Sequence, residues 1–176
     1  MKTNIALIGF MGTGKTAVGK ALTEKLGRSF VELDSLIEQK AGKSIPEIFQ
    51  QDGEIAFREL EIAVTKDVSN QKNLVIACGG GVVLNKINVD RLRREGIIVY
   101  LTASPRVILK RVLGDGGGRP LLEVASPALT IRELLRFRKP FYERAADIKI
   151  DTSRLDINSV TEQIISKMEE HECLNR

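Results

Sequence analysis

Apolar residues follow two alternating patterns along this chain of 176 residues. Short continuous apolar runs predict buried strands, and they cover residues 4–8, 30–33, 74–77, 97–101 and 148–151. Between these runs, apolar residues recur every three or four positions, which is typical of helices with one buried face. Because neighbouring parallel strands need a crossover connection, this alternation favours a parallel α/β sheet.

The helices that this spacing predicts begin and end at recognisable signals. Gly27 and Gly42 stop the first two helices, and Asp34 opens the second. Ser44-Ile45-Pro46-Glu47 has the form of a capping box, a signal for a helix start. Pro140 should kink or end the helix that contains it. Further helices are expected at 53–68, 104–113, from 126 onward and at 157–168.

The stretch from Gly9 to Thr16, GFMGTGKT, matches the phosphate-binding pattern G-x-x-x-x-G-K-[ST]. It stands between a predicted strand and a predicted helix, where backbone N–H groups and the helix start bind phosphate. Lys15 supplies an ammonium for the β- and γ-phosphates, and the Thr16 hydroxyl can ligate Mg²⁺. We predict a nucleoside triphosphate site formed by Gly12, Thr13, Gly14, Lys15, Thr16 and Ala17. The motif alone does not separate kinases, switch GTPases and ATPases.

Composition and charge exclude several other function classes. The net charge of +4 and the pI of about 9.1 are explained by a positive cleft for phosphates. No run of Lys and Arg and no basic patch with interleaved aromatic residues indicates a nucleic-acid partner. Two cysteines and one histidine argue against a disulfide scaffold and a His/Cys zinc site. The first apolar run is too short for a signal sequence or a membrane span, so we expect a cytoplasmic protein.

Two charged residues each have an ordinary and a functional interpretation. Asp34 follows the second predicted strand, where it can cap a helix. Ligands of parallel sheets bind at the carboxyl ends of strands, so Asp34 can equally hold a hydroxyl and accept its proton. Arg58 lies between Glu54 and Glu61 at helical contact spacing. It is either part of an exposed salt-bridge face or an anion-binding arginine held in place by Glu61.

Glycine-rich segments and basic helix ends leave further alternatives open. Gly79-Gly80-Gly81 ends the third strand as a turn or as bare backbone that a ligand approaches. The segment 114–122, with Arg119, is a linker or a mobile lid over phosphates. Arg111 and Arg138 lie near helix ends, where the helix dipole alone can explain them. Asn85-Lys86-Ile87-Asn88 lacks the final Asp of the guanine-reading motif and is discarded, and Cys78 fits core packing.

The whole chain, in length and in the order of its motifs, resembles the shikimate kinase family. The phosphate-binding loop is generic, but the complete set of motifs is specific. The segments that carry the resemblance are Gly9–Thr16, Asp34, Phe57-Arg58-Glu59-Leu60-Glu61, Gly79-Gly80-Gly81, Arg119-Pro120-Leu121-Leu122, Arg138-Lys139-Pro140-Phe141-Tyr142 and Asp151-Thr152-Ser153-Arg154. The resemblance implies a P-loop fold like that of nucleoside monophosphate kinases, with a five-stranded parallel sheet in order 2-3-1-4-5. It also implies a single monomeric kinase domain over 1–176, with a substrate-binding region at about 33–61 and a lid at about 112–124.

The family's activity is the transfer of the γ-phosphoryl group of ATP, with Mg²⁺, to the 3-hydroxyl of shikimate. The products are shikimate 3-phosphate and ADP, on the route to chorismate and aromatic amino acids. By position, the resemblance makes Lys15, Asp34 and Arg119 catalytic. It assigns shikimate to Asp34, Arg58, Gly79, Gly80, Gly81 and Arg138, and it assigns ATP, beyond the phosphate-binding loop, to Arg111, Arg119 and Arg154.

One position departs from the family, and two rival functions remain. The family usually has Asp-x-Asp where this chain has Glu32-Leu33-Asp34. Glu32 is one methylene longer than Asp, which puts the arrangement of water around Mg²⁺ in doubt, although not the contact of Thr16. Another small-metabolite kinase of this fold, such as a gluconate kinase, is the nearest alternative. A regulatory nucleotide-binding switch without an acceptor substrate is the second.

Overall fold

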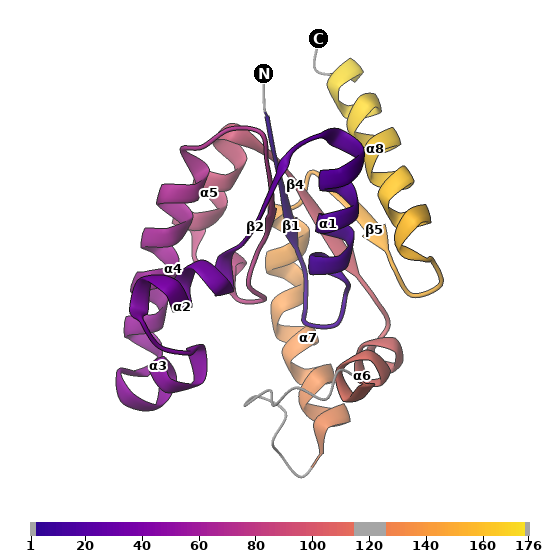
Figure 1. Ribbon diagram of the computed structural model, residues 1–176. Helices are drawn as coiled ribbons and strands as arrows, with labels where there is room; N and C mark the ends of the chain where they lie inside the picture. The colour runs from indigo at the N-terminus through magenta and orange to yellow at the C-terminus, as the bar shows by residue number, and fades with distance from the viewer. Residues whose placement is uncertain (1–2, 115–125, 175–176) are drawn as a thin grey trace.

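Five parallel strands form a sheet in the order β2-β3-β1-β4-β5 (Figure 1). The computed structural model describes residues 3–114 and 126–174. The strands are β1 (Asn4–Ile8), β2 (Ser29–Glu32), β3 (Leu74–Ala77), β4 (Gly96–Thr102) and β5 (Ile148–Asp151). The fold class and the strand order that the resemblance implied are therefore confirmed. The predicted bounds of β1, β3 and β5 match the observed ones, and those of β2 and β4 differ by one residue at each end.

Helices connect the strands and cover both faces of the sheet. They are α1 (Lys15–Leu26), α2 (Leu33–Ala41), α3 (Ile45–Gln51), α4 (Gly53–Ser69), α5 (Lys86–Glu95), α6 (Pro105–Gly114), α7 (Pro127–Ala145) and α8 (Ile157–Leu174), with a 3-10 turn η1 (Val82–Leu84). The capping box at the start of α3 is present in full, because Ser44 and Glu47 each accept from the other's backbone N–H. Gly27 and Gly42 adopt the left-handed conformation at the ends of α1 and α2.

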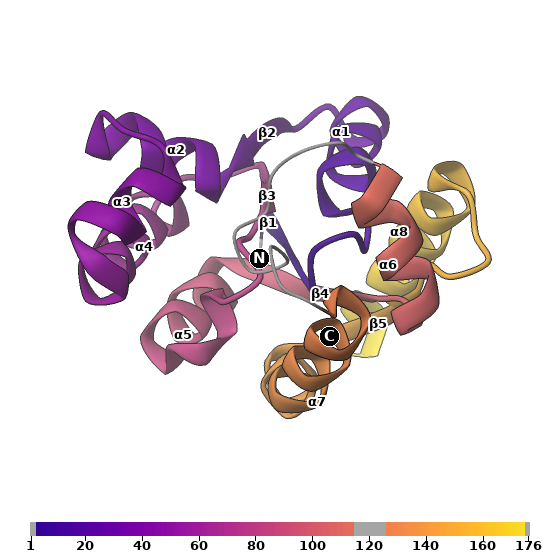
Figure 2. The same ribbon diagram turned by 90° about the horizontal axis from the view of Figure 1, so that it is seen from below.

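The two faces of the sheet carry separate apolar cores. Alternate residues of β1 point to opposite faces, so that Ile5 and Leu7 pack with α1 and α8 while Ala6 and Ile8 pack with α4, α5 and α7. Figure 2, from below, shows these two groups of helices on either side of the sheet. A third apolar cluster joins Phe10 to α6 and α7 just beyond the strand ends. This cluster fixes the base of the phosphate-binding loop.

The structure corrects two expectations, and a third falls largely on residues that it does not describe. Pro140 does not end its helix, because α7 continues to Ala145 while Tyr142 and Ala145 are buried in the core beyond the proline. Asp34 is not the N-cap of α2. Glu32 holds that position, and Asp34 lies in the first turn. The proposed lid falls largely on residues 115–125, including Arg119, which lie outside the described residues.

Parallel strands place their carboxyl ends at one edge of the sheet, where ligands of such folds bind. The phosphate-binding loop follows β1, Asp34 follows β2, and the three consecutive glycines follow β3. Residues 152–155 follow β5. Within the described residues, no helix is both long enough and apolar enough to cross a membrane.

Candidate active site

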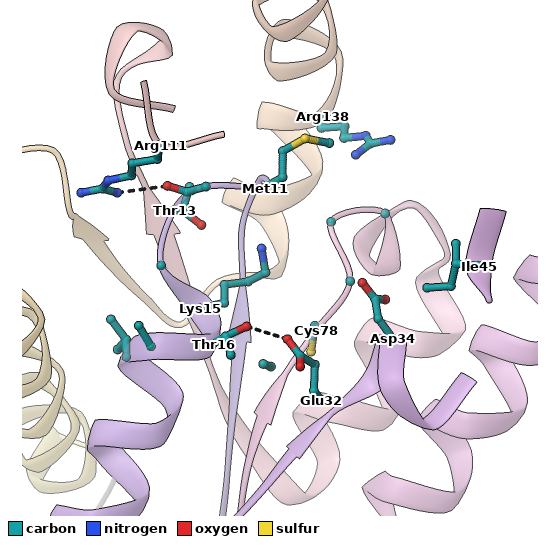
Figure 3. Close-up of a pocket in the computed structure, with 18 of the residues that line it drawn as sticks. Met11, Thr13, Lys15, Thr16, Glu32, Asp34, Ile45, Cys78, Arg111 and Arg138 are labelled. Atoms are coloured by element: carbon teal, nitrogen blue, oxygen red, sulfur yellow. Dashed lines mark hydrogen bonds between the residues drawn. The ribbon is translucent and has the colours of Figure 1, made fainter. Parts of the chain in front are cut away.

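A cavity of about 740 Å³ opens along this edge of the sheet (Figure 3). It extends from the phosphate-binding loop to α3 and α4, and residues 152–160 close its other end. Most of the residues predicted for the site line it, namely Gly12, Thr13, Gly14, Lys15, Thr16, Ala17, Asp34, Arg58, Gly79, Gly80, Gly81, Arg111 and Arg138. The structure therefore brings segments that are distant in the sequence into one pocket.

The backbone of the phosphate-binding loop depends on its glycines. Gly12 and Gly14 have φ values of 74° and 94°, in the left-handed region that residues with a Cβ rarely adopt. At Gly9 a Cβ would lie 2.2 Å from the Leu101 carbonyl oxygen, so no side chain fits there. The Lys15 Nζ donates to the Gly9 and Phe10 carbonyl oxygens at 2.8 and 2.9 Å. The ammonium thus lies over the loop that would receive the phosphates.

Glu32 contacts the phosphate-binding loop directly, which the sequence did not reveal. The Thr16 hydroxyl donates to the Glu32 carboxylate at 2.5 Å, drawn as a dashed line in Figure 3. With its proton directed to Glu32, the Thr16 oxygen keeps lone pairs for a metal ion. Hydroxyl and carboxylate oxygens beside a phosphate loop are ligands that suit Mg²⁺. The described residues contain no cluster of three or more His, Cys, Asp or Glu side chains that could hold a metal without phosphate or water.

Arg111 and Thr152 line the cavity and hold the phosphate-binding loop in place. Arg111 Nη1 donates to the Gly12 carbonyl at 3.1 Å and to the Thr152 hydroxyl at 3.0 Å. Its Nη2 donates to the Thr152 carbonyl at 2.8 Å. The Thr152 hydroxyl lies 3.1 Å from the Thr13 carbonyl oxygen and 3.2 Å from that of Thr102, and both can accept from it. These contacts tie α6, β5 and the loop together.

Not every predicted nucleotide residue is found in the cavity. Arg154 is exposed and does not line it, whereas the neighbouring Thr152 and Leu155 do. Arg119 lies outside the described residues. The sequence indicated Thr152 only as one residue of the Asp151–Arg154 segment that carried the family resemblance. Leu155 had no signal beyond its place after the last strand.

Asp34 lies against the triple-glycine turn at the opposite end of the cavity from residues 152–155. A Cβ on Gly79 would meet the Asp34 Oδ1 at 2.7 Å, so the glycine leaves room for the carboxylate. Burial raises the pKa of Asp34 above its usual value, and the nearby Lys15 ammonium opposes this shift. A carboxyl group with a raised pKa is a better proton acceptor than an ordinary aspartate.

Arg58 is held by two carboxylates of its own helix. Its Nη2 lies 3.1 Å from Glu54, and its Nη1 lies 3.1 Å from Glu61. Glu54 is largely exposed, but the Glu61 side chain is only 2% exposed and lines the cavity. Burial raises the pKa of Glu61, and Arg58 counteracts this. The contact of Arg58 with Glu54 is therefore an exposed salt bridge, whereas its contact with the buried Glu61 is not.

Arg138 is a buried cation that faces the cavity from α7. It is 8% exposed, and its Nε has no hydrogen-bond partner among the described residues. Its Nη1 would lie 3.4 Å from a Cβ on Gly80. A buried guanidinium with an unused donor is costly without an anionic ligand. Arg138 lies seven residues before the last residue of α7 and outside its last turn, so the helix dipole does not explain this arginine.

Apolar residues that sequence reasoning did not select complete the acceptor end of the cavity. Phe49 and Phe57 contact each other with ring centroids 4.8 Å apart, and both line the pocket with Ile45 and Pro46. Cys78 also lines it, and burial raises the pKa of its thiol, which fits packing and not nucleophilic chemistry. The apolar spacing of these residues is the same as that of core residues, so the sequence could not mark them as a ligand wall.

Comparison with known proteins gives one consistent result. A family model described as shikimate kinase matches residues 11–169. A shikimate kinase of Caldanaerobacter subterraneus subsp. tengcongensis is 50% identical over 162 residues, which cover 92% of this chain and 94% of the relative. A shikimate kinase of Thermodesulfovibrio yellowstonii is 49% identical over 166 residues, covering 94% of this chain and 95% of the relative.

Solved structures agree with the sequence relatives. The shikimate kinase of Acinetobacter baumannii in complex with shikimate superposes with a TM-score of 0.91 at 38% identity, covering 97% of this chain and 94% of the other. A gluconokinase of Sinorhizobium meliloti reaches a TM-score of 0.61 at only 16% identity, covering 98% and 95% of the two chains. The second likeness shows a shared fold alone.

Proposed function

The chain belongs to the shikimate kinase family, and on this premise we propose how its cavity performs the reaction. It is an ATP-dependent phosphotransferase that phosphorylates shikimate. We assign the 3-hydroxyl as the acceptor, with shikimate 3-phosphate and ADP as products. The observation that carries this assignment is the convergence of Lys15, Asp34, Arg58 and Arg138 on one cavity. A nucleotide-binding switch needs the first of these residues but not the other three.

The acceptor is an anion with several hydroxyl groups, and each side of the pocket matches one feature of it. Arg58 and Arg138 supply guanidinium groups for the carboxylate, and charge-assisted hydrogen bonds of this kind are strong. The unused Nε of Arg138 is a donor that such an anion can fill. Gly79, Gly80 and Gly81 expose their backbone toward the cavity at the same place.

Asp34 accepts a hydrogen bond from the reacting hydroxyl and takes its proton. As the hydroxyl oxygen forms its bond to the γ-phosphorus, the bond to the leaving oxygen of ADP breaks and the proton passes to Asp34. The raised pKa of the carboxyl group makes this transfer more favourable than for an exposed aspartate. The loose transition state of phosphoryl transfer lowers the demand on the base.

Lys15 stabilises the charge on the transferring group after it leaves its resting contacts with Gly9 and Phe10. Thr16 and Glu32 would hold Mg²⁺ together with the phosphates of ATP, and the ion would neutralise charge on those phosphates. Arg111 would lie beside the base of ATP. The charge-stabilising role predicted for Arg119 in a lid stays a prediction, as does the contact of Arg154 with adenine.

The proposal also includes a cytoplasmic monomer with one kinase domain. The described residues of a single chain line the cavity with Lys15, Asp34, Arg58 and Arg138, so we infer that no second subunit is needed to build it. The low cysteine content fits a reducing compartment.

A substrate panel tests the proposal. ATP consumption coupled to ADP formation should depend on Mg²⁺ and on shikimate, and should be at background with gluconate or a nucleoside monophosphate. Arg138→Ala should abolish the shikimate dependence at low substrate concentration, whereas Arg136→Ala, an exposed arginine of the same helix, should not. Equal turnover with gluconate would favour a different small-metabolite kinase. ATP hydrolysis that no acceptor affects would favour a regulatory nucleotide-binding switch.

A further inference from the structure

Tyr142 is a large buried side chain that the mechanism above does not use. It is fully buried, and its ring stacks on that of Tyr100 with centroids 5.0 Å apart. Its hydroxyl donates to the Gly80 carbonyl oxygen at 2.5 Å. Burial raises the pKa of Tyr142, so the hydroxyl stays protonated and remains a donor under all working conditions. The Tyr142 hydroxyl is therefore a polar group of the buried core that contacts the triple-glycine turn.

The direction of the Gly80 carbonyl fixes the direction of the next N–H group. The structure has no cis peptide bond among its described residues, so the peptide between Gly80 and Gly81 is trans. In a planar trans peptide, the C=O and N–H bonds point in opposite directions. Tyr142 does not line the cavity, whereas both glycines do. With its carbonyl drawn toward the core, this peptide presents the Gly81 N–H to the cavity.

The Gly81 N–H is not used by the described part of the protein. No described residue accepts a hydrogen bond from the Gly81 N–H, although the Gly79 and Gly81 carbonyls both accept from the following 3-10 turn. Gly81 also lies close to Arg58, whose Nη1 would be 2.6 Å from a Cβ placed there. A donor beside a guanidinium is suited to an anionic or hydroxyl oxygen of the acceptor.

Glycine alone would not hold this arrangement. Three consecutive glycines have the greatest backbone freedom of any sequence, and a peptide plane between two of them can turn over at little steric cost. We propose that Tyr142 is a positioning residue for the acceptor, because its hydroxyl holds the Gly80–Gly81 peptide with the Gly81 N–H facing the cavity. This inference rests on the proposed function, which names the acceptor.

Tyr142 lies one helical turn after Arg138 on α7. Residues four apart lie on the same face of a helix, so Arg138 and Tyr142 both face the glycine turn from α7. A Cβ on Gly80 would be 3.4 Å from the Arg138 Nη1 and 3.7 Å from the Tyr142 hydroxyl. One buried helix face thus positions a charged donor and a backbone donor for the same ligand.

Tyr142→Phe tests the inference because it removes only the hydroxyl and keeps the stacked ring. Tyr100→Phe is the matched control, since Tyr100 forms the other half of the stack and does not line the cavity. The loss of one hydrogen bond that orients a donor should raise the shikimate KM about three- to tenfold. The ATP KM should change less than about twofold, and the control should keep both values.

A second measurement separates positioning from a general loss of packing. In ¹H,¹⁵N correlation spectra, the Gly81 amide signal should shift when shikimate is added to the wild type and to Tyr100→Phe. In Tyr142→Phe the signal should broaden or move before shikimate is added, and it should respond less to the ligand. Melting temperatures of both variants show how much stability each hydroxyl contributes.

The outcomes are distinguishable from failure of the proposed function. If the wild type does not phosphorylate shikimate, the function itself is wrong. If the wild type does so and Tyr142→Phe matches Tyr100→Phe in shikimate KM and in the Gly81 response, the positioning role of Tyr142 is wrong. Equal increases in the KM for both substrates would also overturn it, because they indicate a global loss of packing.

Discussion

The nucleotide half and the acceptor half of the cavity are built by different means. In the nucleotide half, Lys15 donates to the Gly9 and Phe10 carbonyls of the phosphate-binding loop, and Arg111 links the Gly12 carbonyl of that loop to Thr152. In the acceptor half, side chains from α2, α4 and α7 meet a glycine turn, and they include buried charges of both signs. In the proposed function, the first half binds phosphate mainly through backbone groups and the second recognises the acceptor through charged side chains.

This difference separates a general function from a specific one. A phosphate loop binds the part of ATP that is common to all nucleoside triphosphates, so its backbone geometry serves many reactions. Buried charges such as Glu61 and Arg138 are costly unless each has a partner. Glu61 has Arg58 as its partner, whereas the Nε of Arg138 has no hydrogen-bond partner among the described residues. In the proposed function an anionic acceptor supplies that partner, so the acceptor half would select the substrate. Variants of the two halves should therefore have separable kinetic effects.

The largest effect is expected in the nucleotide half. Lys15→Ala should reduce kcat by about 10²–10³, because it removes a positioned charge from the transferring phosphoryl group. Lys20→Ala, an exposed lysine of the same helix, is the control and should leave kcat unchanged. Steady-state kinetics and a melting curve are sufficient. A Lys15 variant that keeps most of its turnover would show that the loop is not the ATP site.

Loss of either arginine of the acceptor half should have an effect of comparable size, on the shikimate KM instead of on kcat. Arg58→Ala and Arg138→Ala each leave the substrate carboxylate partly unpaired, at about 2–4 kcal/mol of binding free energy. The shikimate KM should therefore rise about 30-fold or more, with the ATP KM nearly unchanged. An increase in the KM values for both shikimate and ATP would mean that the two halves do not act separately.

Asp34→Asn should separate turnover from stability. It removes the negative charge and the proton-accepting role, so kcat should fall at least about tenfold while ATP still binds. The raised pKa means that the folded protein holds this proton more tightly than the unfolded chain. Stability therefore falls as pH rises from the ordinary value of 3.8 through the folded pKa, and it stays lowered at neutral pH. Asp34→Asn should raise the melting temperature at neutral pH.

The same pKa shift predicts how activity depends on pH. The Asp34 carboxyl must be ionised to accept a proton, and its raised pKa should move the acid limb of kcat above pH 3.8. Asp34→Asn should lack this limb. A profile that is identical in the two proteins would assign the limb to another group and leave Asp34 with a purely positioning role.

The sequence predicted the two halves unequally. The strands and the phosphate-binding loop could be predicted because each depends on contiguous residues, with apolar runs and glycines at fixed spacing. The sheet order depends on contacts between distant segments, and only the family resemblance implied it. Asp34, Arg58 and Arg138 had equally good structural explanations, and only the family resemblance selected their functional roles. The contact of Glu32 with Thr16 and that of Tyr142 with Gly80 join residues 16 and 62 positions apart. No local pattern encodes such pairs, since they arise from how the elements pack.

The smallest predicted effect tests how the nucleotide half is braced. Thr152→Val keeps the shape of the side chain but removes the hydroxyl that links the phosphate-binding loop to Arg111 and to the end of β4. Without this link the loop is held less firmly, so the ATP KM should rise by about two- to fivefold while the shikimate KM stays constant. Thr152→Ser keeps the hydroxyl and should restore the wild-type ATP KM, whereas a loss caused only by altered packing would persist in the serine variant. An effect confined to the shikimate KM would mean that Thr152 acts across the cavity, and the two halves would then be coupled through the loop that lies between them.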